Sequence, residues 1–86
     1  MKPLSPTGQR VLLALAELSG RAQCSVPLRR LAVDLESDYD MTSEQTLFAL
    51  AHLAGWPALT RRTPSGWILT VSGWDLVHQL RAAMES

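Results

Sequence analysis

Residues 47–80 read LFALAHLAGWPALTRRTPSGWILTVSGWDLVHQL, and this stretch decides the fold. Its first apolar residues recur with helical spacing and stop at Gly55, a residue that commonly ends helices. Two short runs with strand character follow, and residues 63–66 between them supply a proline and a glycine for a bend. Apolar residues with helical spacing then resume. The stretch therefore predicts a helix, a β-hairpin over residues 58–71 and a helix over residues 72–84.

Two helices are expected before this stretch. The first covers residues 6–19, with Ser5 as a capping residue and Gly20 as the stop. A short edge strand over residues 23–26 comes next, and a second helix over residues 27–36 follows it. Residues 37–41 are predicted to form a turn.

The helix that precedes the hairpin is expected over residues 42–54. Thr42 and Gln45 have the spacing of a capping box, which begins a helix by satisfying free backbone N–H groups. The helical period predicts an inward face and an outward face. The inward face holds Leu47, Leu50, Leu53 and Ala54, and the outward face holds Glu44, Gln45, Phe48, Ala49 and His52.

Length and composition indicate one small domain over residues 1–86. Hydrophobic residues make up 47% of the chain, which is typical of a globular protein rather than a disordered one. No apolar run reaches the roughly 18 residues that a membrane-spanning helix needs. The first residues lack a signal-peptide pattern, and the single Cys24 cannot form an internal disulfide. We therefore expect a cytoplasmic protein with no membrane segment.

Charge is balanced overall but unevenly distributed. Eight basic and eight acidic residues give a net charge of zero. Residues 1–30 carry five basic residues and one acid, whereas residues 31–60 carry five acids and no lysine or arginine. This acidic middle segment is unfavourable for contact with a polyanion.

The order helix, strand, helix, helix, strand, strand, helix defines a mainly α fold with a small β-hairpin (α+β). In its second half, Leu50 and Leu53 precede Gly55-Trp56, an arginine pair and a Pro-Gly turn follow, and Leu69-Thr70 comes shortly before Gly73 and Leu76. This pattern resembles winged helix-turn-helix transcription regulators of the multiple-antibiotic-resistance-repressor, arsenical-repressor and PadR-like types. The resemblance spans nearly the whole chain in element order and is specific only in the second half.

The resemblance implies that helix 42–54 reads duplex DNA and that the wing over residues 58–71 holds the backbone. The positions that it assigns to base reading are Ser43, Gln45, Thr46, Ala49 and His52. Those that it assigns to phosphate contact are Arg29, Arg30, Arg61 and Arg62. Charged residues also protect edge strands from aggregation, so the hairpin arginines have an alternative explanation.

Two departures from this family pattern support an alternative, a winged-helix module that binds a protein. Helix 42–54 carries no lysine or arginine, and acids lie in or before its first turn, where they also complement the helix dipole. Phe48 lies on the outward face, where an aromatic suits a protein groove. The candidate partner-binding residues are Asp38, Asp40, Glu44 and Phe48.

A homodimer is also expected, because a chain this short builds little core alone and related regulators pair through terminal helices. The candidate dimer residues are Leu13, Trp74, Val77, Leu80 and Met84. His52 and His78 lack partners at metal-ligand spacing, and no phosphate-binding or nucleophile motif is present. We therefore expect no metal, no cofactor and no enzymatic activity.

Overall fold

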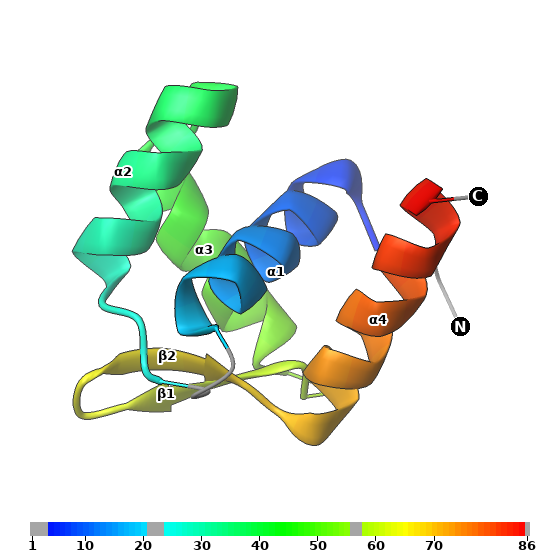
Figure 1. Ribbon diagram of the computed structural model, residues 1–86. Helices are drawn as coiled ribbons and strands as arrows, with labels where there is room; N and C mark the ends of the chain where they lie inside the picture. The colour runs from blue at the N-terminus through cyan, green and yellow to red at the C-terminus, as the bar shows by residue number, and fades with distance from the viewer. Residues whose placement is uncertain (1–3, 21–23, 56–57, 86) are drawn as a thin grey trace.

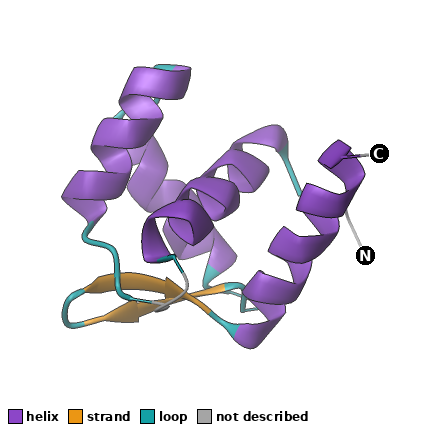
Figure 2. Ribbon diagram, in the orientation of Figure 1, coloured by secondary structure: helices purple, strands orange, loops and turns teal. Residues whose placement is uncertain are grey.

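The computed structural model describes residues 4–20, 24–55 and 58–85. Within these residues the chain is mainly helical with one small antiparallel sheet (Figures 1 and 2). The elements in chain order are α1 (Pro6–Ser19), α2 (Leu28–Tyr39), α3 (Ser43–Leu53), β1 (Thr60–Thr63), β2 (Gly66–Leu69) and α4 (Val71–Glu85). The predicted α+β class is confirmed.

The hairpin lies across one end of the helices, and α4 lies beside α1 (Figure 1). Helix α1 is central, since it packs against α2, α3, α4 and β2. Apolar side chains from all six elements or their flanks meet in one core. Its fully buried members are Val11, Leu12, Leu15, Leu31, Leu35, Leu50 and Val77.

Backbone pairing in the sheet extends beyond the two strands of the hairpin. Thr60 pairs with Leu69, and Thr63 pairs with Gly66 at the turn. On the free side of β2, Val26 and Trp67 form an antiparallel bridge with N–H to O distances of 2.8 and 2.9 Å. Of the edge strand predicted over residues 23–26, only this bridge forms, and residue 23 lies outside the described residues.

The end of α2 differs from the prediction. Ser37, Asp38 and Tyr39 were expected in a turn, but they continue the helix. The helix ends at Tyr39, and Asp40 caps it in the left-handed conformation with φ 58°, donating its N–H to the Glu36 carbonyl at 2.9 Å. Aspartate tolerates this conformation better than most residues. The Arg10 guanidinium lies 4.6 Å from the centre of the Tyr39 ring, a contact that stabilises the last turn of α2.

The second strand also ends earlier than predicted. Residues up to Val71 were expected in β2, but Val71 begins α4 and is 80% exposed. Thr70 fixes the point where the strand gives way to the helix, because its Oγ1 accepts the Gly73 N–H at 3.1 Å and donates to the Ala58 carbonyl. Thr70 thus caps α4.

The orientation of α3 differs from the predicted one. Leu50 and Leu53 are buried as expected, but Leu47 is 43% exposed. Thr46 is fully buried in its place, because its hydroxyl donates to the Thr42 carbonyl at 3.0 Å and its methyl group can then enter the core. The helix is therefore rotated relative to the expected apolar stripe.

Replacing Thr42 by alanine is expected to lower the free energy of unfolding by about 1 kcal/mol. The predicted capping box is present: Thr42 Oγ1 accepts the Gln45 N–H at 3.1 Å, and Gln45 Oε1 accepts the Thr42 N–H at 2.9 Å. Ser43→Ala is the matched control, because Ser43 is the exposed next residue and alanine is a good helix former. Thermal denaturation should show a Tm lower by about 4–8 °C for Thr42→Ala alone. Equal shifts for both variants would contradict the role of the box.

Candidate nucleic-acid interface

Two arginines of the hairpin are available to a ligand. Arg61 and Arg62 are consecutive residues of β1 and both are exposed. Arg61 is opposite Ile68 and Arg62 is opposite Trp67, so their side chains leave the sheet on opposite faces. A groove that receives the hairpin edge-on would contact both side chains.

The start of α2 brings a second pair of arginines to the same end. Arg29 and Arg30 are exposed in the first turn of α2, which begins beside the hairpin (Figure 1). The preceding Val26 is bridged to Trp67, which pairs with Arg62 in turn. With neighbouring strands about 4.8 Å apart, the backbones of Val26 and Arg62 are separated by roughly 10 Å.

Gly66 and a pair of hydroxyl groups hold this arrangement together. A Cβ at Gly66 would overlap the Val26 carbonyl and lie 2.8 Å from the Pro27 nitrogen, so only glycine permits the approach. Gly66 also has φ 145°, which L residues rarely adopt. The Ser25 and Thr63 hydroxyls are hydrogen-bonded at 2.8 Å. The hairpin therefore fixes where the arginines of α2 lie. We call the exposed set Arg29, Arg30, Arg61 and Arg62 the basic end.

The acidic residues gather at the opposite end of α2. Its last turns and the start of α3 lie away from the hairpin (Figure 1). The exposed acids there are Glu36, Asp38, Asp40 and Glu44. The axial rise from Arg30 to Asp40 is about 15 Å, but that from Arg30 to Glu36 is about 9 Å, at 1.5 Å per residue. Asp40 therefore lies beyond the Debye length of about 8–10 Å at ordinary salt, whereas Glu36 lies within it and partly offsets the attraction of an anion to the basic end.

The structure separates the positions expected to read bases. Ser43, Gln45 and His52 are exposed. The side-chain oxygen of Gln45 accepts the Thr42 N–H, which leaves the amide NH₂ group of Gln45 as a donor for a ligand. Thr46 and Ala49 do not fit the expectation. Thr46 is fully buried, and Ala49 is half-buried and packs against the core.

The exposed face of α3 is apolar rather than basic. Phe48 is 76% exposed, as the sequence predicted, and Leu47 beside it was missed. The exposure of Leu47 has no signal in the sequence, because a leucine on an amphipathic helix is expected to face inward. The candidate partner-binding acids Asp38, Asp40 and Glu44 are exposed near this face.

The assignment of Val77 to a dimer contact is wrong, because Val77 is fully buried in the core of one chain. Leu13, Trp74 and Leu80 are half-buried, and the first two pack against the core. Met84 is 72% exposed. The homodimer stays a prediction that rests on Met84 and the accessible parts of the half-buried residues.

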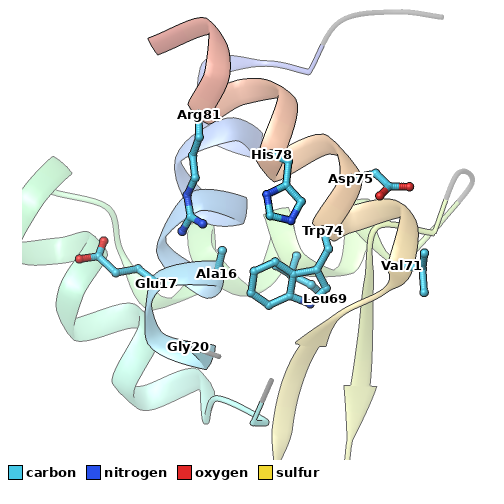
Figure 3. Close-up of a pocket in the computed structure, with 9 residues that line it drawn as sticks. All are labelled: Ala16, Glu17, Gly20, Leu69, Val71, Trp74, Asp75, His78 and Arg81. Atoms are coloured by element: carbon cyan, nitrogen blue, oxygen red, sulfur yellow. The ribbon is translucent and has the colours of Figure 1, made fainter. Parts of the chain in front are cut away.

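An open groove of about 630 Å³ lies between α1 and α4 (Figure 3). Trp74 and His78 line it from α4 with ring centres 6.3 Å apart, and Arg81 extends along it toward the side where Glu17 lies. Across the described part of the chain, no three His, Cys, Asp or Glu side chains come together in a way that could hold a metal ion. No helix within the same residues is long and apolar enough to cross a membrane.

Comparison of the chain with protein families, with curated proteins and with solved structures found no match.

Proposed function

We propose that this chain is a winged-helix domain that binds duplex DNA at its basic end and acts as a transcription regulator. The order of elements supports the winged-helix assignment, with α2 and α3 as the helix-turn-helix and β1–β2 as the wing. The Val26 bridge on the free edge of β2 adds a rudimentary third strand, which that fold places between its first two helices.

The observation that carries the proposal is the basic end. Four exposed arginines come from two segments that the Val26–Trp67 bridge joins. Each guanidinium can form two parallel hydrogen bonds to a phosphate, and neutralised phosphates supply most of the affinity for duplex DNA. Hairpin side chains on both faces suit a wing that enters a groove between two phosphate walls.

The proposal gives α3 a small role in reading sequence. Of the positions expected to contact bases, Ser43, Gln45 and His52 remain accessible, and none offers the bidentate arginine contact that best recognises guanine. We therefore expect binding with a weak sequence preference. In this proposal the chain is a binding protein and not an enzyme.

Arg61→Ala combined with Arg62→Ala is expected to weaken duplex binding at least about tenfold at ~50 mM salt. If both side chains contact phosphates, the slope of log K against log salt should fall by about 1.8, at about 0.9 for each lost contact. Fluorescence anisotropy with a labelled duplex over a salt series measures both quantities. The Arg61→Lys, Arg62→Lys variant keeps the charge and should retain most of the salt slope.

Arg81→Ala is the matched control, because Arg81 is an exposed arginine on α4, outside the basic end. It should leave affinity and salt slope unchanged. No binding by the unaltered chain at low salt, or an equal loss for Arg81→Ala, would refute the proposal.

A further inference from the structure

One face of α3 is apolar and open to solvent. Glu44, Leu47, Phe48 and Ala51 are all exposed, and their spacing of three and four residues places them on a single stripe. Phe48 is 76% exposed and Leu47 is 43% exposed. We call this stripe the α3 surface. Two adjacent exposed hydrophobic side chains in the middle of a helix are typical of a binding face.

Carboxylates dominate the charge around the α3 surface, with Arg10 of α1 nearby over the Tyr39 ring. Glu44 lies at its amino-terminal edge, and Glu36, Asp38 and Asp40 are exposed in the helix end and turn before it. Residues 31–60 contain no lysine or arginine. A ligand that covers Phe48 therefore meets carboxylates at the start of α3 and no lysine or arginine on that helix, with His52 one turn beyond Phe48.

We propose that the α3 surface binds a basic amphipathic helix of a partner protein. Apolar side chains of that helix cover Phe48 and Leu47, and its lysines or arginines meet the carboxylates at the start of α3. The proposal does not rest on DNA binding, because the basic end lies at the other end of α2.

The charge of the α3 surface favours a basic helix over two other occupants, a second copy of the chain and duplex DNA. A second copy docked symmetrically through Phe48 presents the same α3 surface, which carries no lysine or arginine to pair with the carboxylates of the other chain. Duplex DNA covering the same face would bring phosphates against Glu44, and α3 carries no lysine or arginine to neutralise them, so DNA held at the basic end reaches Gln45 and His52 only at the edge of this face.

The probe is a fluorescein-labelled synthetic peptide of about 18 residues, roughly five helical turns, with leucine on one face and lysine on the other. It should bind the full chain saturably in an anisotropy titration, and a peptide with glutamate in place of lysine should not bind. In a ¹⁵N-labelled sample, the largest shift changes should fall on residues 44–51. Absence of binding, or changes centred on another element, would overturn the proposal.

Phe48→Ala should reduce affinity for the lysine peptide at least about tenfold, as expected for a central aromatic contact. Val33→Ala is the matched control, because Val33 is 59% exposed on α2 and lies beside the arginines of the basic end. It should leave affinity unchanged. Equal losses for the two variants would mean non-specific adsorption and would overturn the proposal.

Glu44→Gln combined with Asp40→Asn should also weaken peptide binding and flatten its salt dependence. Asparagine tolerates the left-handed conformation of Asp40, so the turn is preserved. Circular dichroism checks that every variant is folded.

Two further measurements separate this proposal from DNA binding. Arg61→Ala with Arg62→Ala should leave peptide affinity unchanged, and Phe48→Ala should leave duplex affinity unchanged. If Phe48→Ala weakens duplex binding, the α3 surface faces DNA and the docking proposal fails. If sedimentation shows self-association that Phe48→Ala abolishes, a second copy occupies the surface and the proposal fails as well.

Discussion

Replacing Gly73 by alanine is expected to lower the free energy of unfolding by about 3 kcal/mol, the upper end of the usual cost of overpacking. Gly73 is buried in the first turn of α4. A Cβ there would overlap the carbonyl oxygen of Leu59 and lie 3.0 Å from Leu69 Cδ2. The variant can fold only if α4 moves away from the hairpin.

The carbonyl cannot easily give way, because its residue is held on both sides. The Leu59 oxygen accepts the Thr70 N–H at 3.1 Å, and the Leu59 N–H donates to the Leu53 carbonyl at 2.9 Å. Moving Leu59 would thus strain the end of α3 and the cap of α4 together. Since small domains are stable by only about 5–15 kcal/mol, a large share of the stability is lost.

Gly8→Ala is the matched control for this prediction, because Gly8 is also buried in the first turn of a helix. A Cβ built on Gly8 would lie 3.4 Å or more from its neighbours, which is ordinary van der Waals contact. The control should therefore leave the stability unchanged or raise it by up to about 1 kcal/mol, since alanine is the better helix former. Urea denaturation followed by circular dichroism measures both values. A cost for Gly73→Ala no larger than that for Gly8→Ala would contradict the close approach of α4 to the hairpin.

Elements with local signals were predictable from the sequence. Helix α1 begins at Pro6 and ends at Ser19 as expected, because Ser5 Oγ accepts the Gly8 N–H at 3.1 Å and Gly20 takes the positive φ that ends the helix. The capping box of α3 also forms as predicted. In each case the residues that decide the boundary lie within four positions of it.

Features decided by distant residues were not predictable. The last turn of α2 is held by Tyr39 against Arg10, which belongs to another helix. The Val26 bridge, which brings Arg29 toward the hairpin, depends on the missing side chain of Gly66. A helical wheel contains neither kind of information.

The candidate site shows the same division. Exposure of Arg61 and Arg62 was predictable, because a short hairpin has few ways to bury a charge. The burial of Thr46 was not, because hydrophobic periodicity ranks threonine below leucine for an inward position. Satisfaction of its hydroxyl by the Thr42 carbonyl reverses that ranking.

Leu50→Ala is expected to lower the free energy of unfolding by about 3–4 kcal/mol, within the range for a buried leucine. Leu50 is fully buried in the core. Its carbonyl also accepts the hydroxyl of buried Thr60 at 3.0 Å and the Ala54 N–H at 3.0 Å, so α3 and β1 are joined at this position. The cavity left by the missing leucine side chain cannot close easily, because these hydrogen bonds hold the backbone around it.

Leu47→Ala is the matched variant, since it removes the same atoms from the same helix one turn earlier. Leu47 is 43% exposed, so its removal should cost less than about 1 kcal/mol. Chemical denaturation of the two variants under identical conditions gives the comparison. If Leu47→Ala proves as costly as Leu50→Ala, both leucines face inward, as hydrophobic periodicity alone predicts. The stripe from Glu44 to Ala51 would then lose Leu47 to the core, and the basis for a docking surface there would be lost with it.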